Sequence, residues 1–215
     1  MSYLLRVVLP DRPGMLGAIA TALGDAGADI VSLDVVERGP DGAVDDLLVQ
    51  LPPGGLADSL ITAARSVPGV VVESLRPYLG ADDLHRDLEL VDELAAAPHQ
   101  ALQLLVDHAP GVFRAGWALL VGPAGVAARS AGAPEADELD LPPVTAPRRV
   151  LSTEPWVPAR WHDLGVELAV APAGPTATVL LGRPGGPRFR DSEVMRLAHL
   201  AGIAVTVLGT VEVGQ

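Results

Sequence analysis

The pattern of apolar and polar residues predicts six elements within the first 76 residues of the chain. Strict alternation indicates strands, and an i, i+3, i+4, i+7 spacing indicates helices. The first strand alternates from Tyr3 to Leu9 and is stopped by Pro10 and Pro13, which cannot donate ladder hydrogen bonds. Strands are predicted at 3–9, 30–37, 44–51 and 71–76, and helices at 16–23 and 56–64.

The order strand, helix, strand, strand, helix, strand is that of the ferredoxin-like fold, an antiparallel sheet with two helices on one face. Within the strand at 30–37, the alternation directs Val31, Leu33 and Val35 inward and Ser32 and Asp34 outward.

The segments "LPDRPGMLGAIATALGDAGADIVSLDV" and "SVPGVVVESL" resemble an ACT domain, a small regulatory module that usually binds amino acids. The resemblance covers residues 3–78 and implies a domain at 1–79. It also implies that the ligand lies between the loop after the first strand and the start of the second strand of a neighbouring domain. The ligand-binding residues implied in this way are Asp11, Arg12, Pro13, Gly14, Met15, Leu16, Ile30, Val31 and Ser32.

The chemistry of the loop agrees with this site. A helix N-terminus presents unpaired N–H groups that favour a carboxylate, and Gly14 lets a ligand approach the backbone. Asp11 supplies a negative charge suited to an ammonium group. In the alternative interpretation Asp11 only caps the helix, Gly14 only permits the turn, Arg12 is solvated, and Met15 and Leu16 belong to the core.

The second half of the chain does not repeat the first. A junction at 77–87 leads to a predicted helix that Pro98 interrupts, a strand at 115–122, a low-pattern stretch at 123–149 and a hairpin at 166–185. Asp191 is the predicted N-cap of a closing helix whose stripe runs from Val194 to Leu208. This order, and above all "LGRPGGPRFRDSEVMRLAHLAGIAV", resembles a GAF domain, which implies an α+β domain at 86–215 with an antiparallel sheet and flanking helices.

Two tryptophans lie where the GAF resemblance implies a ligand pocket. Trp156 and Trp161 can line such a pocket together with Arg160 and His162. The favoured interpretation is that the two tryptophans simply cover the sheet.

Composition narrows the function classes. The formal net charge is −12 and the 15 basic residues are all arginine, without a basic cluster, which argues against nucleic-acid binding. The chain has no cysteine and no lysine, which excludes thiol catalysis, disulfides, Cys-ligated metals and Schiff-base chemistry. No apolar run long enough to span a bilayer and no signal peptide stand out, so we expect no membrane association and a cytoplasmic protein.

No catalytic or metal-binding motif is recognisable. The five histidines are scattered, and neither a nucleophile elbow nor a phosphate-binding loop occurs. Asp45 and Asp46 can hold a cation, but a hairpin edge is a common place for solvated acids. We therefore expect neither metal nor cofactor.

The sequence supports a non-enzymatic regulatory protein that senses a small amino acid or a related metabolite at the interface of a homodimer. The alternative is a dimerising scaffold that holds a partner enzyme and has no ligand of its own. A third hypothesis, an enzyme, requires a polar cleft with titratable residues between the domains.

Overall fold

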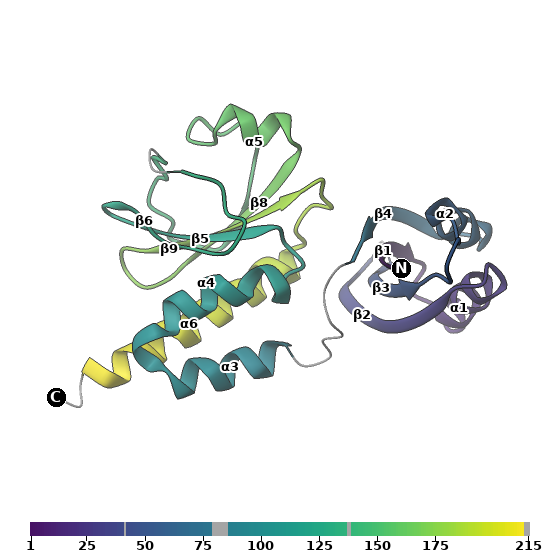
Figure 1. Ribbon diagram of the computed structural model, residues 1–215, viewed down its shortest axis with the longest axis horizontal. Coiled ribbons are helices and arrows are strands. Elements are labelled where there is room, and N and C mark those ends of the chain that lie inside the picture. Colours follow the sequence, from purple (N-terminus) through teal and green to yellow (C-terminus); the bar gives the residue numbers. More distant parts are fainter. Residues whose placement is uncertain (41, 79–85, 137–138, 213–215) are drawn as a thin grey trace. The chain divides into compact units, whose positions relative to one another are not determined.

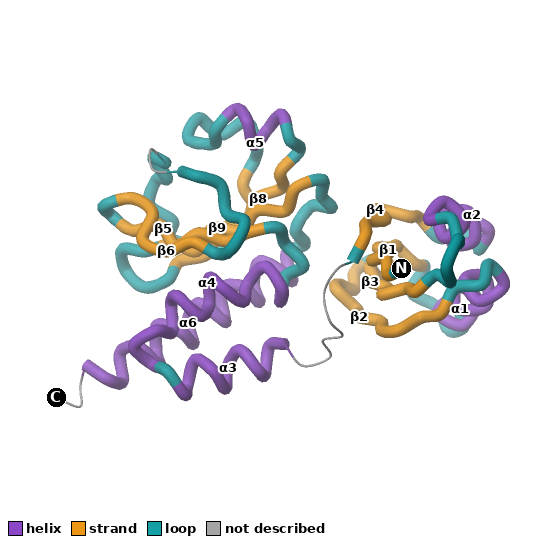
Figure 2. Tube along the Cα trace, in the orientation of Figure 1, coloured by secondary structure: helices purple, strands orange, loops and turns teal. Residues whose placement is uncertain are grey.

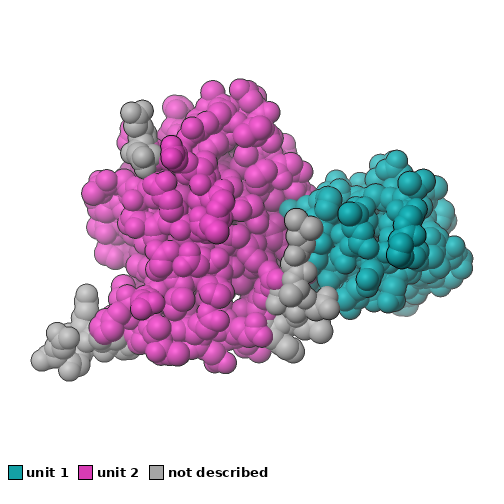
Figure 3. Space-filling view, in the orientation of Figure 1, with its two compact units in different colours: residues 1–84 teal, residues 85–215 magenta. Residues whose placement is uncertain are grey.

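Two structural units make up the chain, residues 1–84 and residues 85–215, and each has a hydrophobic core of its own (Figure 3). The computed structural model describes residues 1–40, 42–78, 86–136 and 139–212. The predicted junction at 77–87 falls mostly on residues 79–85, which lie outside the described residues.

The first unit is an antiparallel sheet with strand order β2-β3-β1-β4 and two helices on one face (Figures 1 and 2). The ferredoxin-like prediction is confirmed, because the two crossover helices connect strands that are not neighbours in the sheet. The elements are β1 (Ser2–Leu9), α1 (Met15–Asp25), β2 (Asp29–Gly39), β3 (Gly42–Gln50), α2 (Ala57–Ser66) and β4 (Val71–Pro77).

Strand register decides which side chains enter the core of the first unit. β1 places Leu5 opposite Leu47 of β3, and both pack against the helix residues Ile19, Leu23 and Leu60. Side chains on this face of β1 and β3 therefore point toward α1 and α2, and those at alternate positions point to the other face.

The expectation that Val31 points inward is wrong. β2 is an edge strand whose register shifts between Ile30 and Ser32 and again between Val35 and Glu37. These bulges take Val31 out of the alternation. Val35 pairs with Asp45 and so lies on the helix-covered face as expected, but its place on the edge strand leaves it 44% exposed.

The second unit is a five-stranded antiparallel sheet of order β6-β5-β9-β8-β7. Helices α3, α4 and α6 pack together over one face, and α5 lies on the other side (Figure 1). This agrees with the α+β architecture that the GAF resemblance implies. The elements are α3 (Arg86–Ala96), the 3-10 turn η1 (Pro98–Gln100), α4 (Ala101–Val112), β5 (Trp117–Gly122), β6 (Gly125–Arg129), β7 (Arg148–Val150), α5 (Ala159–Asp163), β8 (Val166–Pro172), β9 (Thr178–Pro184) and α6 (Asp191–Glu212).

The N-terminus of α6 is built around a buried ion pair. Arg183 of β9 is fully buried and donates to Glu193 at 2.6 Å. The other carboxylate oxygen of Glu193 accepts the backbone N–H of Arg190 at 2.8 Å, while the Arg190 carbonyl accepts the N–H of Val194. Arg190, and not the predicted Asp191, is thus the N-cap residue, and Glu193 supplies the N3 half of a capping box by accepting its N–H.

Helix α6 also corrects the expectation about membrane spans. Its residues 191–209 are long and apolar enough to cross a membrane by length and composition, with a mean hydropathy of 1.2. Leu197, Ala201 and Ala204 of this stretch are fully buried in the core of the second unit. A helix that lies in the core of a protein can be as long and as apolar as a membrane-spanning helix. The stretch is therefore weak evidence for a membrane span.

Candidate ligand site

Helix α1 begins without a side-chain cap. Gly14 occupies the N-cap position in a left-handed conformation, with φ 90° and ψ −11°, and makes no side-chain cap hydrogen bond, while the N–H of Met15 donates to the Arg12 carbonyl at 3.4 Å. The alternative in which Asp11 caps the helix is therefore wrong. The first-turn N–H groups, together with the positive end of the helix dipole, form a place where an anionic group is stabilised.

The loop before α1 is open to solvent. Asp11, Arg12, Pro13 and Gly14 are exposed, and a Cβ added at Gly14 would meet no atom within 4 Å. Glycine is thus required here by its positive φ and not by close packing of the protein itself. The free space above Gly14 lies where a ligand would approach the helix.

Met15 and Leu16 have different environments although they are adjacent. Met15 is 7% exposed, packs in the core and accepts a hydrogen bond from Nε of Arg12 at 3.3 Å. Leu16 is 39% exposed. The core interpretation therefore holds for Met15 and is wrong for Leu16, because the helix turns Leu16 away from the sheet.

The two predicted halves of the site lie at opposite ends of the sheet within one chain. The loop follows Leu9, which pairs with Ala43, whereas Ile30 pairs with Val49. Val49 lies six positions after Ala43 along β3, which corresponds to about 20 Å along the strand. One copy of the chain does not bring Ile30, Val31 and Ser32 to the loop.

A buried acid that we expected to be solvated lies beside the loop. Asp45 is 1% exposed, and its register opposite Val7 places it on the helix-covered face of the sheet. Its Oδ1 atom is buried without a hydrogen-bond partner. Burial raises the pKa of Asp45, Arg38 opposes this shift, and the neighbouring charges of Asp46 and Asp11 add to it.

Asp46 points to the opposite face and is also buried. It accepts two hydrogen bonds from Arg6, at 2.6 and 2.7 Å. The expectation of a solvated hairpin edge is wrong for both acids, because β3 lies between β2 and β1 and is an inner strand. The signal in the sequence was a pair of acids inside the otherwise apolar run "AVDDLLVQL".

The tryptophan candidates of the second unit do not line a common pocket. Trp161 is 2% exposed and packs against Trp117, with ring centroids 4.8 Å apart. Trp156 donates to Glu154 at 2.8 Å, Arg160 donates to the Glu135 carbonyl, and His162 is exposed. The interpretation that the tryptophans cover the sheet is confirmed for Trp161.

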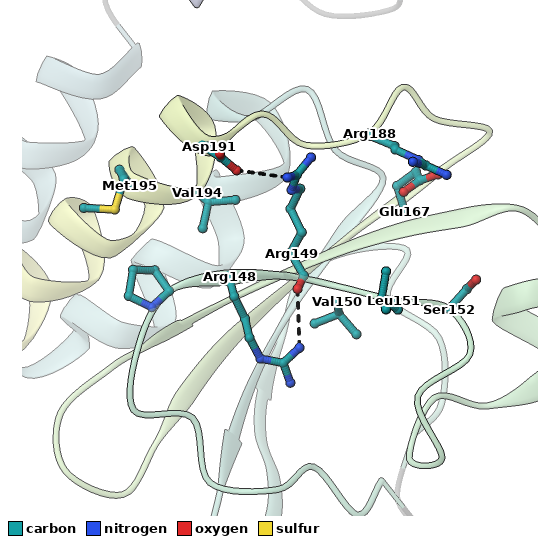
Figure 4. A pocket seen from close by; sticks show the side chains of 11 residues that line it. Arg148, Arg149, Val150, Leu151, Ser152, Glu167, Arg188, Asp191, Val194 and Met195 are labelled. Atoms are coloured by element: carbon teal, nitrogen blue, oxygen red, sulfur yellow. Dashed lines mark hydrogen bonds and ion pairs between the residues drawn. The ribbon is translucent and has the colours of Figure 1, made fainter.

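A pocket of about 560 Å³ opens between β7 and the first turn of α6 (Figure 4). Three arginines line it, and each has an acidic partner. Arg148 pairs with Glu154 at 2.6 Å, Arg149 with Asp191 at 3.3 Å, and Arg188 with Glu167 at 3.7 Å. The positive charge of the pocket is thus largely balanced by the protein itself.

The Arg148–Glu154 pair predicts an acid-sensitive contribution to stability. Arg148, assisted by Trp156 and the N–H of Leu151, lowers the pKa of Glu154 to about 2. Because the pKa is lower in the folded state, the contribution is complete above the unfolded pKa of about 4.5 and is lost as the pH falls toward 2. Glu154→Gln should cost about 1 kcal/mol at pH 7, since the pair is partly exposed.

Urea unfolding followed by tryptophan fluorescence between pH 7 and pH 2 tests this prediction. The difference between the wild type and Glu154→Gln should shrink below pH 4.5. A difference that stays constant over the whole range would contradict the assignment. Asp163→Gln is a suitable control, because its carboxylate is 77% exposed.

Among the described residues, no group of three or more His, Asp or Glu side chains is arranged to hold a metal ion.

Comparison with known proteins identifies the first unit. The family model of the ACT domain matches residues 3–76. The chain is also similar to the solved GAF domain of a putative sensor histidine kinase from Pseudomonas syringae pv. tomato, with 14% identity, a TM-score of 0.44, and coverage of 60% of this chain and 87% of that one.

Two further solved structures are similar over 97% of this chain. One is an unknown protein from Galdieria sulphuraria, with 13% identity, a TM-score of 0.34 and 91% of that chain covered. The other is the ligand-free regulatory subunit of aspartate kinase from Thermus thermophilus, with 14% identity, a TM-score of 0.29 and 90% of that chain covered. No curated protein matches the sequence.

Proposed function

We propose that the protein senses a small amino acid or a related metabolite, on the premise that residues 3–76 match the family model of the ACT domain, a regulatory and ligand-binding module. The observation that carries the proposal is the start of α1. Its N-terminus has no side-chain cap and lies beside the exposed carboxylate of Asp11. We propose no catalytic role for this unit.

The two ends of an amino acid match the two charges of the loop. The ligand carboxylate accepts hydrogen bonds from the first-turn N–H groups behind Gly14, and the helix dipole stabilises its charge. The ligand ammonium faces the carboxylate of Asp11. An anion site directly beside an acidic side chain selects a zwitterion over a simple anion, which Asp11 would repel.

A second copy of the chain completes the proposed site. The loop and residues 30–32 lie at opposite ends of one sheet, so both can contact one ligand only across an interface. A ligand that bridges two copies stabilises only their paired arrangement, and ligand binding is in this way coupled to dimer geometry.

The second unit is proposed to pass the signal to a partner, such as an enzyme. Trp117, Trp161 and Leu180 fill the sheet face opposite the three packed helices with the protein's own side chains. This packing favours an interaction role over a second ligand pocket. The second candidate function, a dimerising scaffold for an enzyme, rests on the same observation and leaves the loop empty.

Asp11→Asn tests the proposed site. We expect calorimetry against the common amino acids at millimolar concentration to detect binding to the wild-type chain. The substitution should weaken that binding by about 10-fold, because it removes a charge-assisted contact. Asp25→Asn, an exposed acid at the other end of α1, is the matched control and should bind like the wild type.

Failure to bind any of the amino acids would contradict the sensing proposal and leave the scaffold. In that case light scattering should show the same dimer with and without amino acids. Equal binding by the Asp11→Asn and Asp25→Asn variants would remove Asp11 from the site.

A further inference from the structure

Strand β3 carries a buried acid with an oxygen atom that no hydrogen bond satisfies. Asp45 is 1% exposed, its Oδ1 atom has no hydrogen-bond partner, and no ion pair joins it to another described side chain. Arg38 is near enough to act on its charge, yet the two side chains form no ion pair. Burying a polar atom without a hydrogen-bond partner is costly, so this atom calls for an explanation, of which a bound ligand group is one.

Asp45 lies next to the loop before α1. It is two residues along β3 from Ala43, which pairs with Leu9 at the end of β1 where the loop begins. This spacing is about 7 Å along the strand. The side chain of Asp45 is on the face that α1 covers, and the charge of Asp11 acts on it directly. The unpartnered carboxylate and the uncapped helix start therefore belong to the same end of the unit.

The part of β2 nearest to this carboxylate is exposed. Val35 pairs with Asp45 across the ladder and is 44% exposed, and Arg38, which pairs with Ala43, is exposed as well. Paired residues of neighbouring strands share a face of the sheet, so Val35 lies beside Asp45 at the edge of the helix-covered face. In the proposal, the ligand group reaches Asp45 past Val35.

We propose that Asp45 receives the ammonium group of the bound ligand, with Asp11 as the outer acid, so that the ligand is an amino acid and not its hydroxy-acid or oxo-acid counterpart. The assignment rests on the proposed function, because it adds Asp45 as a second acidic residue to the same proposed site. It restricts the ligand class to compounds that carry both an anionic group for the α1 amides and a primary ammonium.

An ammonium fits this place better than a divalent metal ion. An ammonium has three donors and is satisfied by a few oxygen atoms. Ca²⁺ takes six to eight oxygen ligands, and Mg²⁺ demands an octahedral set. The carboxylates of Asp45 and Asp11 offer four oxygen atoms at most.

Paired ligands that differ only in the ammonium group test the assignment. Calorimetry compares glycine with glycolate, L-alanine with L-lactate, and L-serine with L-glycerate on the wild type, on Asp45→Asn and on the control Asp25→Asn. The wild type should prefer the amino acid of a binding pair by roughly 10- to 100-fold, as expected for a charge-assisted contact. Asp45→Asn should lose this preference, and Asp25→Asn should keep it.

The outcomes separate the two proposals. If the wild type binds an amino acid and Asp45→Asn binds it equally well, the assignment of Asp45 is overturned while the sensing function stands. If the wild type binds the hydroxy acid as tightly as the amino acid, the assignment is likewise overturned. If no amino acid binds, both proposals fail. Unchanged binding of the hydroxy acid by Asp45→Asn, together with an unchanged circular-dichroism melting curve, shows that the variant is folded.

Discussion

Glu193→Gln is expected to lower the free energy of unfolding of the second unit by about 3–5 kcal/mol, because it leaves the charge of Arg183 buried without its partner. Arg183 is fully buried and donates to Glu193 at 2.6 Å and to the Phe113 carbonyl at 2.5 Å. Its guanidinium also lies 3.9 Å from the ring centroid of Phe189. The arginine is thus held in place and cannot turn to solvent when the carboxylate is lost.

Urea unfolding followed by tryptophan fluorescence measures this loss in the second unit alone, because the three tryptophans of the chain are Trp117, Trp156 and Trp161. Glu167→Gln is the matched control. Its partner Arg188 is 81% exposed and 3.7 Å away, so the cost should stay below about 1 kcal/mol. Equal losses in the two variants would contradict the role assigned to the buried pair.

The double variant Arg183→Met with Glu193→Gln refines the test. It removes the buried charge and keeps an oxygen on residue 193 for the N–H of Arg190. Replacing a buried ion pair by apolar side chains is often close to neutral, so the double variant should recover most of the stability. No recovery would indicate that the packing of Arg183, and not its charge, carries the effect.

Gly182→Ala is expected to destabilise the second unit by about 3 kcal/mol. A Cβ at this position would lie 2.1 Å from Cε2 and Cζ2 of the Trp117 ring. That ring is 4% exposed and packs against Trp161, so it has no free space to move into. The substitution should also change the fluorescence emission of the native state.

Gly202→Ala is the matched control for the same substitution. Gly202 lies within α6, and a Cβ there would meet no atom within 4 Å. Alanine is the better helix former, so the variant should gain up to about 1 kcal/mol. The two variants should therefore shift the urea midpoint in opposite directions. A Gly182→Ala variant as stable as the wild type would show that the Trp117 ring is not confined.

Local patterns were sufficient for the element order of the first unit, whereas β6, β7 and α5 of the second unit were not predicted, because they lie in or after the low-pattern stretch at 123–149. The alternation from Tyr3 to Leu9 and the helical stripe from Leu16 to Leu23 depend only on near neighbours in the chain, so β1 and α1 could be predicted. The same holds for the hairpin of β8 and β9, whose turn is marked by Pro172 and Pro175.

Burial of charged residues could not be predicted in the same way. Asp45 and Asp46 follow the hairpin turn, which favoured the interpretation as solvated acids, although the ferredoxin-like order places this strand inside the sheet. The contacts that bury them join residues distant in the chain, such as Arg6 and Asp46, which are 40 positions apart. The same kind of long-range contact makes Arg183 and Arg6 interior residues.

The ferredoxin-like order, the loop at residues 11–16 and the lack of cysteine and lysine can be read from the sequence, because they follow from residue types and from spacings of a few positions. Three features required the folded structure: the burial of Asp45 with its Oδ1 atom unsatisfied, the place of residues 30–32 at the far end of the sheet, and the place of Trp161 in the core. Each of these depends on which strands and helices meet, and such contacts join residues that are distant in the chain.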